Sequence, residues 1–272
     1  PMRPMSSDSA VLEVTGLRAG YPGQPDTIHE IDLSLSSGEI VGIIGESGGG
    51  KSTLLSCLLG LRPGGLAVRD GSIRYQGVDI THATAKSWRR LRGPEVAMVF
   101  QRPMASFDPL IRVSRQFVES VRLHSPKVSQ QACLAASRDL LKRLRFDDPD
   151  AVLGAFPFEL SGGMAQRAAI AMALLSEPRV LLADEPTSAL DVRAQAEVLE
   201  LLSQTASQLG TAVLFVSHQI SLVRRLVSRV QMLANGTFVE SGPPQQVLVA
   251  PEHPYTQALI AAVPTLEGRD AA

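Results

Sequence analysis

The stretch that decides the fold is GEIVGIIGESGGGKSTLLSCLLG, residues 38–60. The short apolar run over 40–44 predicts a buried strand, and the apolar residues 53–61 predict a helix. Between them, residues 45–52 fit the pattern G-x-x-x-x-G-K-[S/T]. A strand, a glycine-rich turn and a helix in this order predict a phosphate-binding loop (P-loop) in an α/β protein.

The chemistry of phosphate binding explains the composition of this turn. Glycines allow backbone N–H groups to surround phosphate oxygens, and the N-terminus of the helix adds partial positive charge. Lys51 can reach the terminal phosphates, and the Ser52 hydroxyl can bind Mg²⁺. The predicted nucleoside triphosphate site comprises Gly45, Glu46, Ser47, Gly48, Gly49, Gly50, Lys51, Ser52 and Thr53.

A second apolar run, Val180 to Ala183, predicts a buried strand that leads into Asp184 and Glu185. Side chains alternate along a strand, so two adjacent carboxylates should have different tasks. We assign Asp184 to Mg²⁺ and its waters, and Glu185 to the general base that activates water beside the γ-phosphate. Such a pair alone is weak evidence, but beside a complete P-loop it indicates hydrolysis.

Two further predicted strands, 95–101 and 212–218, deliver Gln101 and His218. In open α/β sheets, ligands bind beyond the carboxyl ends of the strands. We therefore expect both side chains near Lys51, with Gln101 close to Mg²⁺; the alternative is that each is an ordinary loop residue. Upstream, Tyr21 is either a hairpin residue or an aromatic plate for a purine base.

A second serine–glycine turn occurs in LSGGMAQR, residues 160–167, before a predicted helix from Met164 to Leu175. The N-terminus of a helix offers free N–H groups and a favourable dipole to an anion. No lysine follows, so this turn is not another P-loop. We expect Ser161, Gly162 and Gly163 to close over ATP that is bound by another subunit.

The segment 102–160 shows no strand pattern and predicts a helical insertion that carries the second turn away from the P-loop. Its clearest element is an amphipathic helix over Ser129 to Phe146. The apolar side of this helix is expected to comprise Ala132, Leu134, Leu140, Leu141 and Leu144.

The bulk composition sets limits on the function. The chain has 272 residues, 44% of them apolar, and a net charge of −1, which gives no electrostatic case for nucleic acid. No apolar run approaches the roughly 20 residues that span a bilayer, and the first residues lack the apolar core of a signal peptide. Cys57 and Cys133 form no metal-binding spacing, which favours a reduced, cytosolic chain.

Taken together, GESGGGKS, Gln101, LSGGM, LLADEP, SALD and His218 occur in the order of the ATP-binding-cassette (ABC) ATPases, which the chain resembles over nearly its whole length. The resemblance implies a P-loop NTPase (RecA-like) core with an N-terminal antiparallel β subdomain and an inserted α-helical subdomain. It also implies a head-to-tail pair of ATPases with two ATP molecules between them. Tyr21 would then stack on adenine, and His218 would contact the γ-phosphate. The residues expected to contact the partner's ATP are Ser161, Gly162, Gly163, Gln166 and Asp191.

From this resemblance we expect three regions. Residues 8–101 and 164–249 would form the nucleotide-binding core with the β subdomain. Residues 102–163 would form the helical subdomain, and residues 250–272 a C-terminal helical tail. Alternation in IHEIDLSLS (28–36) is consistent with the antiparallel β subdomain.

Two stretches, residues 90–113 and 251–264, resemble ATPases of dipeptide, oligopeptide and nickel importers. The lack of a C-terminal cysteine cluster favours a short member that serves nickel or a metal chelate. The implied partners are a second, usually different ATPase, two integral membrane permease subunits and an extracytoplasmic solute-binding protein. This chain would lie peripherally on the cytoplasmic face of the plasma or inner membrane, with the loop 103–109 docking a permease helix.

Three residues depart from the pattern of the family. Gly49 replaces a common serine, which backbone binding should tolerate. Gln219 follows His218 where aspartate is usual, and Phe158 stands where histidine is frequent.

Two other classes of protein fit the sequence less well. A cassette ATPase of DNA repair or translation would need a long coiled coil, zinc cysteines or a second cassette. A GTPase or small-molecule kinase would leave the LSGGM turn unexplained, and no N-K-x-D guanine-binding motif appears.

Overall fold

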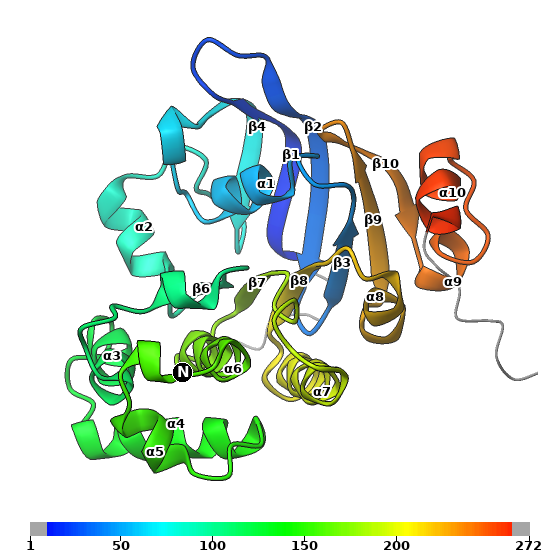
Figure 1. Ribbon diagram of the computed structural model, residues 1–272. Coiled ribbons are helices and arrows are strands. Elements are labelled where there is room, and N and C mark those ends of the chain that lie inside the picture. The colour runs from blue at the N-terminus through cyan, green and yellow to red at the C-terminus, as the bar shows by residue number, and fades with distance from the viewer. Residues whose placement is uncertain (1–9, 263–272) are drawn as a thin grey trace, which may run out of the picture.

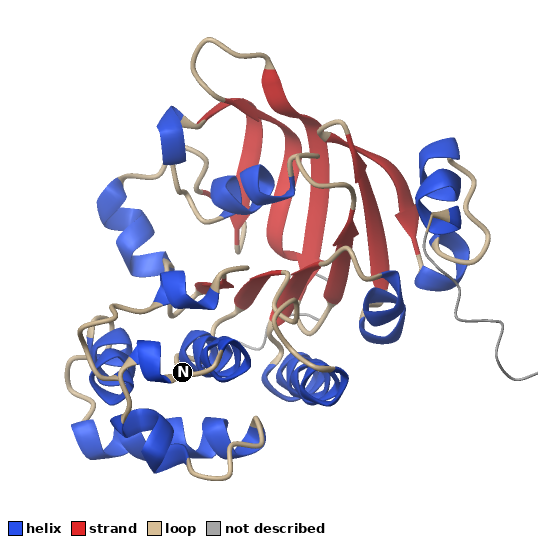
Figure 2. Cartoon of the chain, viewed as in Figure 1, coloured by secondary structure: helices blue, strands red, loops and turns tan. Residues whose placement is uncertain are grey.

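Two β-sheets organise residues 10–262, the part of the chain that this computed structural model describes (Figures 1 and 2). The larger sheet has six strands in the order β10-β9-β3-β8-β7-β6. All neighbours in it run parallel except β9 and β10. Its strands are β3 (Ile40–Ile44), β6 (Val96–Val99), β7 (Val180–Asp184), β8 (Ala212–Val216), β9 (Arg229–Ala234) and β10 (Thr237–Gly242). Every residue of β3, β7 and β8 is buried, as expected for parallel strands covered on both faces.

The smaller sheet is antiparallel, in the order β2-β1-β4-β5. Its strands are β1 (Ala10–Gly20), β2 (Asp26–Ser36), β4 (Ala67–Tyr75) and β5 (Val78–Asp79). Along β2, buried and more exposed residues alternate from Ile31 to Ser36. The predicted antiparallel β subdomain is therefore confirmed.

Helix α1 (Lys51–Leu58) packs between the two sheets and contacts β1, β2, β4 and β7. Its apolar residues join a core that includes the adjoining face of the large sheet, with Val41 and Leu214 fully buried. The other helices of the core are α2 (Ala85–Leu91), α6 (Gly162–Leu174), α7 (Val192–Leu209), α8 (Ile220–Leu226), α9 (Pro244–Val247) and α10 (Pro254–Ala261). Within residues 10–262, no helix is both long and apolar enough to cross a bilayer.

The predicted helical insertion is present and contains no strand between residues 102 and 160. It comprises η2 (Pro103–Ser106), α3 (Val113–Arg122), α4 (Gln130–Arg143), α5 (Pro149–Gly154) and η3 (Pro157–Glu159). These helices gather on the side of the large sheet that also carries α6 and α7 (Figure 1). Phe117 and Leu141 share one apolar core with Phe215 of the large sheet, so the insertion packs continuously onto the core.

The predicted apolar side of α4 is partly wrong. The buried residues within it are Cys133, Ser137 and Leu141, which recur every four residues on one face. Ala132 is exposed because it lies one residue, about 100° of helical rotation, away from that face. Its N–H group instead donates to the N-cap hydroxyl of Ser129 at 3.1 Å.

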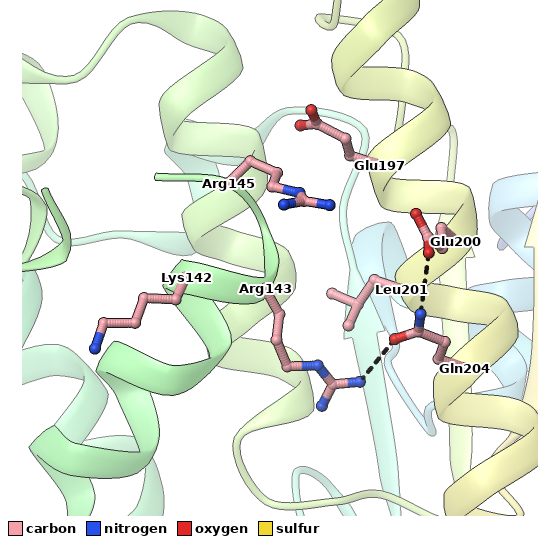
Figure 3. A pocket seen from close by; sticks show the side chains of 7 residues that line it. All are labelled: Lys142, Arg143, Arg145, Glu197, Glu200, Leu201 and Gln204. Carbon is pink, nitrogen blue, oxygen red and sulfur yellow. Dashed lines mark hydrogen bonds between the residues drawn. The ribbon is translucent and has the colours of Figure 1, made fainter. Parts of the chain in front are cut away.

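A hollow of about 330 Å³ separates the end of α4 from α7 (Figure 3). Basic side chains from the helical segment face acidic side chains of α7, and Arg143 contacts Gln204 at 3.4 Å. No residue of the P-loop lines this hollow. It therefore marks the border of the helical insertion, separate from the predicted nucleotide site.

The expected regional boundaries remain a proposal. The limit between residues 163 and 164 falls inside α6, which begins at Gly162. The tail beyond residue 250 contains α10, while residues 8–9 and 263–272 lie outside the described part.

Candidate nucleotide site

The predicted P-loop connects β3 to α1. At Gly45 and Gly50 the structure leaves room for no residue other than glycine, for two different reasons. A Cβ atom on Gly45 would lie 2.2 Å from the Leu233 carbonyl oxygen of β9. Gly50, the residue before α1, has a φ of 101°, a conformation that side chains with a Cβ rarely adopt. Glycine is therefore required at two positions of the turn, at Gly45 by close packing and at Gly50 by conformation.

Lys51 folds back onto the loop. Its Nζ donates to the carbonyl oxygens of Gly45 and Glu46, each at 2.7 Å. Burial lowers the pKa of Lys51, while the carboxylates of Glu185 and Asp184 work in the opposite direction. An ammonium group has three donors, so one remains for a phosphate oxygen.

Ser52 and Asp184 meet at the ends of α1 and β7. The Ser52 hydroxyl lies 3.2 Å from Asp184 Oδ2. Burial raises the pKa of Asp184, and the nearby charge of Glu185 adds to this effect, whereas Ser52 and Lys51 oppose it. A buried carboxylate that lacks a full counter-charge suits a cation, and a hydroxyl with a carboxylate provides oxygen donors that Mg²⁺ prefers.

Glu185 follows β7 and contacts a different set of partners from Asp184, as expected of two carboxylates with different tasks. Its Oε2 accepts from Gln101 Nε2 at 3.0 Å, and its Oε1 lies 3.0 Å from His218 Nδ1. The backbone of Glu185 has a φ of 45°, which is uncommon for a residue with a side chain. Three strand ends thus bring Gln101, Glu185 and His218 together.

A cavity of about 210 Å³ lies where these groups converge. It is lined by Ser47, Gly48, Gly50, Lys51, Ser52, Thr53, Gln101, Asp184 and Glu185. A second cavity, on the other side of the loop, is lined by Glu46 and Gly49 among others. Most of the residues predicted to bind ATP line one or both of these cavities, whereas Tyr21 lines neither.

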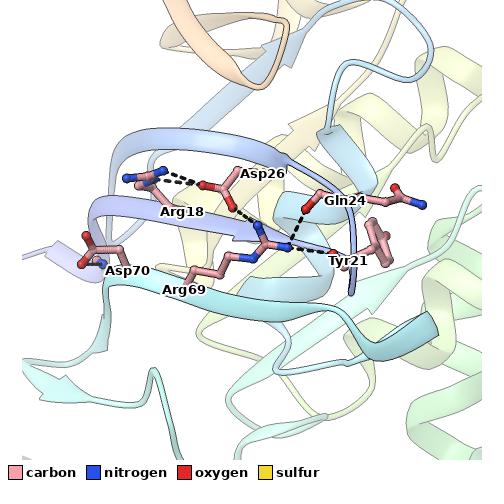
Figure 4. Close-up of polar contacts among 7 residues, drawn as sticks. Arg18, Tyr21, Gln24, Asp26, Arg69 and Asp70 are labelled. Carbon is pink, nitrogen blue, oxygen red and sulfur yellow. Dashed lines mark hydrogen bonds and ion pairs between the residues drawn. The ribbon is translucent and has the colours of Figure 1, made fainter.

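Tyr21 lies in the loop between β1 and β2 (Figure 4). Hydrogen bonds and ion pairs of two arginines, Arg18 and Arg69, hold this loop in place. Arg69 donates to the carbonyl oxygens of Tyr21 and Gln24 at 2.7 and 2.8 Å. Asp26 bridges Arg69 and Arg18, each at 2.8 Å. The sequence did not predict these contacts, because an arginine in a strand gives no indication of which distant residues it will bind.

The second turn lies at the start of α6, which begins two residues earlier than predicted. The helix begins at Gly162, and the Ser161 hydroxyl accepts the Met164 N–H group at 3.3 Å. Ser161 and Gly162 are exposed, and apart from its chain neighbours and the backbone of its own helix nothing would lie within 4 Å of a Cβ on Gly162. Neither residue lines the cavity at the P-loop of the same chain.

Two other residues that were expected to reach a partner's ATP differ in exposure. Asp191 is exposed and caps α7, where its Oδ1 accepts the Ala194 N–H group at 2.8 Å. Gln166 is fully buried, and its amide has no hydrogen-bond partner within the described residues. Its place on the inner face of α6 gives no support to the predicted contact with ATP.

Gln219 and Phe158, which depart from the pattern of the family, each have one clear contact. The Gln219 N–H group donates to the Ser217 hydroxyl at 3.0 Å, at the start of α8. The Phe158 ring is 63% exposed and stacks on Phe156, with ring centroids 5.5 Å apart. Nothing in the structure explains why these residues replace the usual ones.

Comparisons with known proteins agree with this geometry. Residues 28–188 match the family described as ABC transporter, and residues 239–271 match the oligopeptide/dipeptide transporter C-terminal region. The probable D,D-dipeptide transport ATP-binding protein DdpD of Escherichia coli is 41% identical over 93% of this chain and 78% of that protein. The dipeptide transport ATP-binding protein DppD of Lactococcus lactis is 31% identical over 96% of this chain and 76% of that protein.

The glutathione import ATP-binding protein GsiA of Salmonella typhimurium is 40% identical over 94% of this chain, which spans only 42% of that protein. Among solved structures, the dimeric cassette MJ0796 bound to ADP and Pi has a TM-score of 0.78 and 24% identity. The match covers 86% of this chain and 98% of that one, and it shows the fold. The chain therefore belongs to the ABC transporter ATPases, in their oligopeptide/dipeptide subfamily, which bind and hydrolyse ATP to drive transport.

Proposed function

We propose that this chain powers an importer of dipeptides, oligopeptides or a related peptide such as glutathione. The observation that carries the choice of substrate is the match of residues 239–271 to a region named for peptide transporters. The relatives described above are named for D,D-dipeptide, dipeptide and glutathione transport. The expected nickel or metal-chelate specificity has no support in these matches.

ATP would bind with its phosphates in the cavity at the P-loop, where Lys51 has one donor left for a terminal phosphate. Ser52 and Asp184 would hold Mg²⁺, which neutralises phosphate charge during transfer. Glu185 would accept a proton from the attacking water, while Gln101 and His218 position its carboxylate. Tyr21 would stack on the adenine ring.

The second serine–glycine turn would serve ATP on a partner ATPase. A Cβ atom on Gly162 would meet nothing within 4 Å apart from its chain neighbours and the backbone of its own helix, and its backbone is not left-handed, so the fold does not require glycine there. A phosphate group that approaches from outside would need that open space, together with the N–H groups at the start of α6. The exposed Asp191 would lie in the same contact.

A permease helix would dock in an apolar groove of about 350 Å³ beside the 103–109 loop. Phe100, Ala105 and Met172 line this groove, and the neighbouring Met104 is 40% exposed. Apolar surface that is open in a single subunit is typical of an interaction site. The assembly would comprise two such ATPases, this chain and a different paralogue, with two permease subunits and an extracytoplasmic binding protein. In such an assembly the chain would lie on the cytoplasmic face of the membrane.

The test is to purify the chain with its membrane subunits and binding protein, reconstitute the assembly in vesicles, and follow ATP hydrolysis. We expect peptides to stimulate phosphate release and Ni²⁺ to leave it unchanged. Stimulation by Ni²⁺ alone would overturn the proposed substrate. In the control, Glu185→Gln should retain ATP binding while turnover falls by about 10²–10⁴-fold; near-normal turnover would refute the role of Glu185.

A further inference from the structure

The C-terminal helix α10 reaches the P-loop through one side chain. The phenol oxygen of Tyr255 accepts the backbone N–H group of Glu46 at 3.0 Å, across 209 residues of sequence. That N–H group belongs to the same peptide unit as the Gly45 carbonyl, which accepts Lys51 Nζ at 2.7 Å. Because a peptide unit is planar, fixing the direction of its N–H group also fixes the direction of its carbonyl.

The same peptide unit is confined from the other side. The carbonyl oxygen of Leu233 in β9 lies 2.2 Å from the position of a Cβ on Gly45, so the loop packs closely against that strand. Tyr255 also lines the cavity on the outer side of the loop, together with Glu46 and Gly49. The peptide that orients Lys51 is therefore held between β9 and α10.

Tyr255 is itself held by hydrogen bonds that begin on the edge of the large sheet. Glu240 of β10 accepts the N–H groups of Glu252 and His253 at 2.9 and 3.2 Å. His253 Nδ1 in turn accepts the Tyr255 N–H group at 3.2 Å. A continuous path thus runs from the Glu240 carboxylate to the backbone of the P-loop.

We propose that Tyr255 is a positioning residue for nucleotide binding. It orients the Gly45–Glu46 peptide so that two donors of Lys51 are occupied and the third is presented to the phosphates. The inference rests on the proposed role of the P-loop. It also gives the C-terminal region, matched over residues 239–271, a task at the nucleotide site.

The first test is Tyr255→Phe in the full chain, with ADP binding measured by isothermal titration calorimetry. Loss of one hydrogen bond should raise the Kd for ADP about threefold to tenfold. In the reconstituted assembly the KM for ATP should rise by a similar factor while kcat stays unchanged, a split that general destabilisation would not produce. As a matched control, Tyr75→Phe removes a phenol that contacts Glu95, away from the loop, and should leave the Kd unchanged.

The second test perturbs the path without touching Tyr255. Glu240→Gln removes one acceptor and should also weaken ADP binding, but it should add nothing to Tyr255→Phe if both act through the same contact. Glu252→Gln, which alters a neighbouring exposed carboxylate, is its control.

The outcomes separate this inference from the proposed function. If the unaltered chain fails to bind ADP, both are overturned. If the unaltered chain binds ADP and Lys51→Ala weakens that binding, while Tyr255→Phe binds as tightly as the unaltered chain, the positioning role alone is overturned.

Discussion

The P-loop at 45–52 and the turn at 161–163 have similar compositions and opposite surroundings. In the P-loop, a Cβ on Gly45 would collide with the backbone of β9, and Gly50 has a left-handed conformation. At the second turn, Gly162 has an ordinary backbone and open space around it. This fold therefore requires glycine at Gly45 and Gly50. Nothing in the described part of the chain requires glycine at Gly162.

The contrast extends to charge and burial. Lys51 is only 8% exposed and already bonded to its own loop, whereas Ser161 is exposed and no lysine accompanies it. A complete cradle can hold a nucleotide by itself. The second turn offers only the N–H groups and the dipole of a helix N-terminus, which suits the proposed role of completing a site on another molecule.

The largest effect expected from this comparison is on hydrolysis in the partner subunit. Ser161→Arg, assembled with an unaltered partner, should slow hydrolysis at the partner's P-loop by about 10²–10³-fold, comparable to the loss of a preorganised donor. Single-turnover phosphate release from ATP bound at the partner site measures it. Ser203→Arg, on the exposed side of α7, is the control. Unchanged hydrolysis at the partner site would refute the in-trans role.

A smaller effect is expected on binding at the chain's own site. Lys51→Ala should weaken ADP binding about tenfold to a hundredfold, because a charge-assisted bond to phosphate is lost. Calorimetric titration with ADP measures the change, and Lys86→Ala at the exposed surface of α2 is the control. Ser161→Arg should bind ADP with normal affinity in the same assay. Equal affinities for Lys51→Ala and the unaltered chain would count against the placement of Lys51.

The smallest effect concerns stability and compares the two glycines directly. Gly45→Ala should lower the free energy of unfolding by about 1–3 kcal/mol through overpacking against Leu233. Gly162→Ala should leave it unchanged or raise it by up to about 1 kcal/mol, because alanine favours helices. Urea denaturation of both variants without nucleotide checks this. A loss at Gly162 as large as that at Gly45 would show that the second turn serves its own fold.

Sequence reasoning predicted the features that local patterns encode. Apolar runs indicated the buried strands of the core, and the resemblance to the family implied the antiparallel sheet, with which the alternation in residues 28–36 agrees. The residues after each strand indicated that Gln101, Glu185 and His218 converge. It could not predict the left-handed backbone of Glu185 or the burial of Gln166, because both depend on how distant elements pack. The contact of Tyr255 with Glu46 was also invisible, since no periodicity links residues so far apart.

Both oxygens of the Glu185 carboxylate have contacts in the chain by itself, one with Gln101 and the other with His218. Each oxygen can accept more than one hydrogen bond, so a water molecule can still reach this carboxylate, but only along the directions that these two contacts leave open. The two contacts thus act as a template that limits where an attacking water molecule could stand relative to Glu185.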